Sequence, residues 1–98
     1  MPDHSFLVIA HDKNGAEELR AQNRDAHVAY LKQPHENVTI DVGGPLIAND
    51  HHSAGTFLVV AAPDRAAVEK FVANDPFSSA GIFSSVEIKD CKVTLRAK

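Results

Sequence analysis

The chain has 98 residues, of which 44% are hydrophobic and 23% charged, and its formal net charge is −3. This length fits a single domain over residues 1–98, and the apolar fraction is that of a globular chain rather than a disordered one. The mildly acidic balance, with 10 basic residues against 13 acidic ones, gives no general attraction to nucleic acid or to a membrane surface.

The first half of the chain contains two apolar segments separated by a polar one. Ser5 to His11 includes Phe, Val and Ile and is typical of a strand. Asn14-Gly15 opens a stretch rich in Ala, Glu and Arg, which runs to Pro34 and predicts a long helix. Val38 to Val42 is rich in β-branched residues and predicts a strand that stops at the turn 43–45, Gly-Gly-Pro.

The second half predicts a loop, a strand and a helix. Leu46 to Gly55 contains Asn, Asp, His and Ser and is expected to form a loop whose course the sequence does not fix. Thr56 to Ala62 is a strongly apolar strand. Asp64 is a suitable N-cap for a helix that ends at about Asn74.

The last predicted strand, Ser85 to Leu95, has apolar residues on both parities. Val86 and Ile88 would point to one face of a sheet, whereas the apolar residues from Cys91 onward would point to the other. A bulge or a bend near Asp90, which could divide the strand in two, would remove this conflict.

The resulting order, β-α-β-β-α-β, predicts an α+β fold of the ferredoxin-like kind, a four-stranded antiparallel sheet with both helices on one face. The first and third strands would be central. In Phe6 to Ile9 and in Phe57 to Val60 the residues that point to either face of the sheet are apolar. The face without helices would therefore expose an apolar patch. We therefore expect a symmetric homodimer that packs sheet against sheet.

The first predicted helix carries a basic row beside its apolar stripe. At about 100° per residue, Arg20, Arg24 and His27 are neighbours, with His27 at the edge of the face that packs on the sheet. The members of that stripe are Ala16, Leu19, Asn23, Ala26 and Tyr30. The row could be a half-buried imidazole with guanidinium groups for an anionic substrate, or ordinary solvated charges beside a boundary histidine.

A second candidate site is the segment 74–77, Asn-Asp-Pro-Phe. Proline after Asp75 favours a role for this aspartate as the cap of a short turn that ends at Gly81. Asp75 could also orient His27 by accepting a hydrogen bond from its imidazole. The two interpretations are compatible because a carboxylate has two oxygens.

Other patterns give weaker indications. His51 and His52, beside Asp50, lack the spacing that presents two ligands to one metal ion, so we expect no metal. Cys91 is the single cysteine, cannot form an internal disulfide and is expected to be buried and inert. Neither a phosphate-binding loop nor aromatic residues interleaved with basic ones are present, which disfavours nucleic acid binding.

The location of the protein is expected to be cytoplasmic. A lone cysteine fits a reducing compartment. The longest apolar stretches, Phe6 to Ala10 and Phe57 to Pro63, are far shorter than the ~20 residues of a membrane-spanning helix. The first residues also lack the basic and apolar regions of a signal peptide.

Taken in order, these segments resemble the YciI-like (YCII-related) family over nearly the whole chain. The motifs that carry the resemblance are His11-Asp12-Lys13, Arg20, the run Arg24 to Leu31, Gly44-Pro45-Leu46, Gly55, Asp64 to Glu69, Asn74-Asp75-Pro76-Phe77, Ala80 to Phe83, and Val86-Glu87-Ile88. One departure is visible after the last strand, where family members often carry an aromatic residue and this chain has the segment 90–92, Asp-Cys-Lys.

The resemblance implies a dimeric α+β barrel in which two ferredoxin-like units pair through their sheets. It also implies a His–Asp pair, here His27 and Asp75, with Arg24 lining the cleft. One relative of this family eliminates HCl from chlorinated hydroxyquinols, and the fold is shared with muconolactone isomerases and with monooxygenases that lack bound cofactors.

We therefore expect an enzyme that moves protons on a small acidic or phenolic metabolite, in an elimination, isomerisation or lyase step. His27 would be the general acid and base, Asp75 its orienting partner, and Arg24 with Arg20 the anchor for a carboxylate or phenolate. Nothing in the chain requires a cofactor. The alternative is a dimeric module that binds a small metabolite without catalysis.

Overall fold

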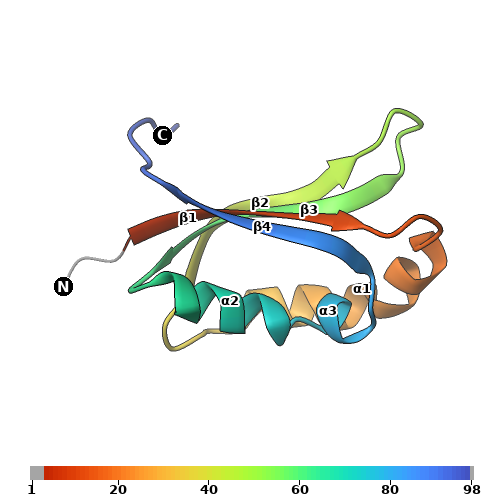
Figure 1. Ribbon diagram of the computed structural model, residues 1–98, viewed down its shortest axis with the longest axis horizontal. Coiled ribbons are helices and arrows are strands. Elements are labelled where there is room, and N and C mark those ends of the chain that lie inside the picture. Colours follow the sequence, from red (N-terminus) through yellow and green to blue (C-terminus); the bar gives the residue numbers. More distant parts are fainter. Residues whose placement is uncertain (1–3, 98) are drawn as a thin grey trace.

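The computed structural model describes residues 4–97 as one antiparallel sheet with helices packed on one face (Figure 1). In chain order the elements are β1 (His4–Asp12), α1 (Glu17–Lys32), β2 (Thr39–Ile47), β3 (Ser53–Ala62), α2 (Arg65–Ala73), α3 (Pro76–Ser79) and β4 (Phe83–Cys91). None of the described helices is long and apolar enough to cross a membrane.

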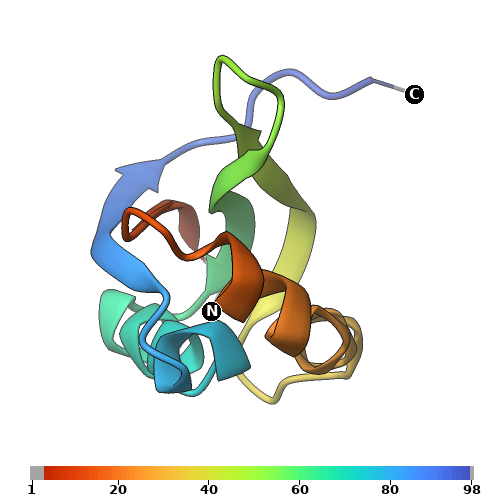
Figure 2. The same ribbon diagram turned by 90° about the vertical axis from the view of Figure 1, so that its right-hand side faces the viewer.

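The sheet has the strand order β2-β3-β1-β4, and every neighbouring pair is antiparallel. The three helices lie on the same side of the sheet, and the opposite face is left uncovered (Figures 1 and 2). The ferredoxin-like α+β fold predicted from the order of elements is confirmed, and so is the central position of the first and third strands.

The strand β2 is longer than predicted. The Gly-Gly-Pro segment does not end it, because Gly43 pairs with Leu58 and Pro45 pairs with Thr56 as β2 continues to Ile47. Pro45 is tolerated because β2 is an edge strand, where a missing N–H need not remove a ladder hydrogen bond. The expected loop over residues 46–55 therefore shrinks to the five residues between Ile47 and Ser53.

The predicted bulge near Asp90 is wrong. The pairing of β4 with β1 is regular from Cys91 to Ser85, and the register shifts only at the other end, between His11 and Asp12. The parity conflict disappears because the strand ends at Cys91, so the later apolar residues are not part of it. Cys91 itself is exposed rather than buried.

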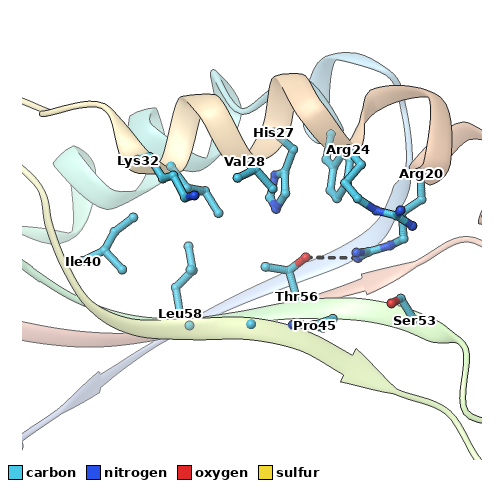
Figure 3. Close-up of a pocket in the computed structure, with 14 residues that line it drawn as sticks. Arg20, Arg24, His27, Val28, Lys32, Ile40, Pro45, Ser53, Thr56 and Leu58 are labelled. Carbon is cyan, nitrogen blue, oxygen red and sulfur yellow. Dashed lines mark hydrogen bonds between the residues drawn. The ribbon is translucent and has the colours of Figure 1, made fainter.

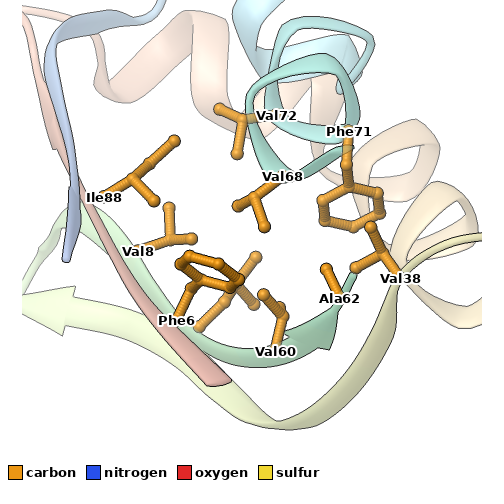
Figure 4. Close-up of a cluster of buried hydrophobic side chains, with 10 residues drawn as sticks. Phe6, Val8, Val38, Val60, Ala62, Val68, Phe71, Val72 and Ile88 are labelled. Carbon is orange, nitrogen blue, oxygen red and sulfur yellow. The ribbon is translucent and has the colours of Figure 1, made fainter. Parts of the chain in front are cut away.

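The main core lies between the sheet and α2 (Figure 4). Alternate residues of the two central strands point into it, and α2 covers them with Val68, Phe71 and Val72. The strand and loop residues of this cluster are Phe6, Val8, Val38, Leu58, Val60, Ala62 and Ile88. The other parity of the central strands is only half-buried and faces the uncovered side.

The inner face of α1 is rotated from the predicted one. Leu19 is 43% exposed and Ala26 is exposed, whereas Arg20 and His27 are the buried residues of this helix. Tyr30 and Leu31 pack against the core from the last turns. The prediction from the apolar stripe is wrong because the buried side chains of α1 are Arg20 and His27, whose carboxylate partners compensate the cost of burying them.

Tyr30 joins α1 to α2, because its hydroxyl donates a hydrogen bond of 2.6 Å to the carbonyl oxygen of Phe71. Burial, followed by the negative charge of Asp75, raises the pKa of Tyr30 above its usual 10.0. The folded chain therefore keeps the phenol proton to a higher pH than the unfolded chain does. The free energy of unfolding should fall as the pH rises above 10.0, because only the unfolded chain then loses the proton.

This pH dependence can be measured directly because Tyr30 is the only tyrosine and the chain has no tryptophan. Titration by the ultraviolet absorbance of the phenolate should give a higher midpoint for the native chain than for the chain in concentrated urea. The variant Tyr30→Phe should lose this alkaline destabilisation, while its free energy of unfolding at neutral pH falls by about 0.5–1.5 kcal/mol. Equal midpoints for the native and unfolded chains would contradict the assignment.

Candidate functional site

A cavity of about 380 Å³ lies between α1 and the strands β2 and β3 (Figure 3). Its roof is the inner face of α1, its floor is formed by β2 and β3, and Phe77 of α3 completes its wall. The lining side chains divide into a polar group, Arg20, Arg24, His27, Lys32, Ser53 and Thr56, and an apolar group, Val28, Leu31, Ile40, Pro45, Leu58 and Phe77.

The imidazole of His27 points from α1 into this cavity (Figure 3). Its Nδ1 lies 2.8 Å from Oδ1 of Asp75, and both side chains are almost fully buried, at 8% and 6% exposed. A carboxylate can only accept a hydrogen bond, so Nδ1 carries the proton and donates it. The other ring nitrogen, Nε2, makes no hydrogen bond with a described residue.

Asp75 makes two contacts with the same carboxylate oxygen. The oxygen that accepts from His27 also accepts from the backbone N–H of Phe77 at 2.9 Å, so Asp75 caps α3. The structure thus contains both arrangements that the Asn-Asp-Pro-Phe segment allowed, the cap and the contact with His27. Because Pro76 begins α3 and fixes the backbone there, the carboxylate is held toward α1 by a rigid turn.

Arg20 is tied into the fold by the chain around it. Its Nε and Nη2 donate to the two oxygens of Asp12, at 2.7 and 3.2 Å. Nη2 also donates to the carbonyl oxygen of Gly55 at 2.7 Å and to Oγ1 of Thr56 at 3.1 Å. The ion pair with Asp12 compensates the charge of Arg20, and Nη1 is the nitrogen left without a hydrogen bond to the described residues.

Phe77 connects the two buried polar groups of α1. Its ring is stacked on the imidazole of His27, with centroids 3.8 Å apart and planes 4° apart. The guanidinium carbon of Arg20 lies over the same ring, 4.7 Å from its centroid. An imidazole and a guanidinium on one aromatic ring gain from stacking and from cation–π attraction.

The charges that line the cavity are positive. Arg24, three residues before His27, and Lys32 reach it from exposed positions on α1, and no carboxylate is among the described lining residues. With Asp12 bound to Arg20, the uncompensated charge comes from Arg24 and Lys32. Such a cavity favours a ligand that is partly apolar and carries negative charge.

The remaining candidates lie away from this cavity. His52 contacts Asp50 within the hairpin between β2 and β3, and it lies 3.9 Å from Glu17 at the start of α1. Neither His51 nor His52 lines the cavity. Within residues 4–97, no group of three or more His, Cys, Asp or Glu side chains is placed to hold a metal ion.

Sequence reasoning missed Asp12, Thr56 and Lys32. Asp12 lies at the end of β1 and Thr56 within β3, and only the fold brings both to Arg20 of α1. A single polar residue at an inward position of an apolar strand was the available signal for Thr56, since such residues need a buried partner. Lys32 had no signal, because a lysine near the C-terminus of a helix is ordinary.

Comparison with known proteins finds relatives of this chain in sequence and in fold. Residues 5–92 match the YCII-related domain. The proteins named YciI from Escherichia coli O6:H1 and from Shigella flexneri are each 26% identical over 93 residues, which cover 89% of this chain and 95% of the relative.

The solved structures that are similar in fold include the following two. One is the 5-chloro-2-hydroxyhydroquinone dehydrochlorinase TftG from Burkholderia phenoliruptrix AC1100, in complex with 2,5-dihydroxybenzoquinone. It is 34% identical, with a TM-score of 0.79, over 90% of this chain and 93% of that one. The other, PA3566 from Pseudomonas aeruginosa, is 14% identical, with a TM-score of 0.57 over 97% of both chains, and shares the fold.

The buried ion pair between Arg20 and Asp12 is expected to contribute to the stability of the fold. Arg20→Met should lower the free energy of unfolding by about 3–5 kcal/mol, because it leaves the Asp12 carboxylate buried without its partner. The control is Arg24→Met, because Arg24 lies on the same helix but is exposed, and this change should alter the free energy of unfolding by less than about 0.5 kcal/mol. Urea unfolding of both variants measures the difference, and equal losses would contradict the structural role of Arg20.

Proposed function

Because the chain belongs to the YCII-related domain family, we propose that it is a small-molecule enzyme in which His27 is the general acid and base. The observation that carries the proposal is the buried hydrogen bond of 2.8 Å from His27 to Asp75, with the other ring nitrogen facing a cavity of about 380 Å³. Asp75 fixes the tautomer and stabilises the imidazolium that forms when Nε2 takes a proton.

The reaction class that fits this site is an elimination on a hydroxylated ring. Nε2 removes an O–H proton, the oxygen becomes a carbonyl, and the imidazolium returns the proton to the ring carbon that bears the chlorine. A second hydroxyl then loses its proton to Nε2 while the C–Cl bond breaks with its electron pair. The net loss is one proton and one chloride, so neither an oxidant nor a cofactor is needed.

Similarity to the dehydrochlorinase supports this class, because that protein is named for the loss of HCl from a chlorinated hydroxyhydroquinone and is bound to a dihydroxybenzoquinone. In this chain the phenolate oxygen of such a substrate would be held by Arg24 and by the free Nη1 of Arg20, and the ring would pack on the apolar half of the cavity. Arginine suits oxyanions because its donors form a rigid fork.

We also propose that the chain forms a homodimer through the uncovered sheet face. Five residues of the central strands on that face are apolar and only half-buried, namely Leu7, Ile9, Phe57, Val59 and Ala61. A second copy would remove this apolar surface from water.

The exposed thiol of Cys91 supports a cytoplasmic location, since a reducing compartment keeps it from oxidation.

His27→Gln should lower kcat for HCl release from 5-chloro-2-hydroxyhydroquinone by about 10²–10⁴-fold, because glutamine can hydrogen-bond but cannot accept the proton. The assay measures chloride release under anaerobic conditions, with Lys32→Gln as the matched control on the same helix. The Lys32→Gln variant should change KM more than kcat.

Unchanged turnover in His27→Gln would refute acid–base catalysis by this residue. If the wild-type chain binds 2,5-dihydroxybenzoquinone in calorimetry but turns over neither chlorinated hydroxyquinols nor lactones, the function is that of a non-catalytic binding module. Absence of both binding and turnover would exclude hydroxyquinones as the ligand class.

Val59→Glu should convert the dimer to a monomer, because it places a charge at the centre of the apolar sheet face. The matched control is Ala26→Glu, which adds the same charge on the exposed side of α1. Sedimentation analysis at micromolar concentration measures the mass of both variants and of the wild-type chain. A monomeric wild-type chain would contradict the dimer.

A further inference from the structure

We propose that Phe77 is the positioning residue of this site: its ring sets the plane of the His27 imidazole, and so aims Nε2 at the substrate. The inference rests on the proposed function of His27 and adds a residue to it. Phe77 makes no hydrogen bond with its side chain and carries no charge, so its contribution to the reaction would be geometric.

One hydrogen bond does not fix an imidazole ring. The torsion between Cβ and the ring is broad, because it joins an sp³ carbon to an sp² carbon. The bond from Nδ1 to Asp75 selects which ring edge faces the carboxylate, but it leaves the ring free to tilt about that contact. The parallel face of Phe77, 3.8 Å away and 4° from coplanar, removes this freedom.

The same short segment supplies both constraints. Asp75 Oδ1 accepts from His27 and from the N–H of Phe77, and the Phe77 ring then lies against the His27 ring. Any shift of α3 would therefore move the carboxylate and the stacking face together. The imidazole keeps one orientation relative to α3, which is the preorganisation that proton transfer requires.

Phe77 is itself held on several sides. Its side chain is fully buried, Arg20 lies over its ring at 4.7 Å, and the ring of Phe83 meets it edge-on at 6.1 Å. Arg20 is anchored in turn by Asp12 of β1 and by residues 55 and 56 of β3. The central strands thus support the imidazole through Arg20 and then Phe77.

The test compares two fully buried residues of the same small cluster, Phe77 and Ile82. Phe77→Leu keeps an apolar side chain but loses the flat face, and should lower kcat by about 10–100-fold while KM stays within about threefold. Ile82→Ala removes packing from the same cluster but keeps the Phe77 ring, and should leave kcat within about threefold although the chain becomes less stable. Phe77→Met, a more adaptable side chain, replaces Phe77→Leu if the latter does not fold.

A second readout does not depend on turnover. In proton and nitrogen NMR of the wild-type chain, the ring protons of His27 should show the upfield shift expected over an aromatic face, and its nitrogens should show the Nδ1–H tautomer. In Phe77→Leu the upfield shift should disappear and the ring signals should broaden, whereas Ile82→Ala should keep both features.

Equal losses of kcat in Phe77→Leu and Ile82→Ala, or unchanged His27 ring signals in Phe77→Leu, would overturn the positioning role. If the wild-type chain has no turnover, the proposed function fails, and the NMR comparison still decides whether Phe77 orients His27. If turnover is lost in His27→Gln but unchanged in Phe77→Leu, the proposed function stands and the positioning role fails.

Discussion

Burying a charged or strongly polar side chain under a helix costs free energy unless a partner compensates it, and α1 buries two of them. Arg20 is compensated by Asp12 and His27 by Asp75, so the inner face of α1 is held by polar contacts as well as by apolar packing. The partners come from β1 and from the cap of α3. Through these contacts α1 joins the end of β1 to the start of α3, which are far apart along the chain.

This constraint also divides the interior by function. The apolar cluster under α2 needs no partners beyond close packing, and it gives the sheet and α2 a rigid core. Under α1 the interior combines apolar side chains with polar and positively charged ones around a cavity. The edge strand β2 completes that region, because Gly43 has no side chain to fill it and an added Cβ would run into the side chain of Leu58.

The chemistry that the fold permits depends on the nitrogen atoms of the buried side chains that make no hydrogen bond within the described residues. His27 uses Nδ1 on Asp75 and keeps Nε2, while Arg20 uses Nε and Nη2 and keeps Nη1. One basic nitrogen and one cationic donor thus remain for a ligand on the inner face of a single helix. The structural contacts and the proposed catalysis depend on the same residues, so a change in either partner alters stability and chemistry together.

The sequence by itself determined the order of elements and the central strands, because strand and helix periods and turn residues are local features. The residues left open whether Asp75 only caps a turn or also contacts His27, and the family resemblance favoured the contact. Only the tertiary structure decided which face of α1 is inside, where β2 and β4 end, and that Asp12 and Thr56 meet Arg20. Those outcomes depend on partners distant along the chain, whose charges and ladder hydrogen bonds outweigh the apolar pattern of any one segment.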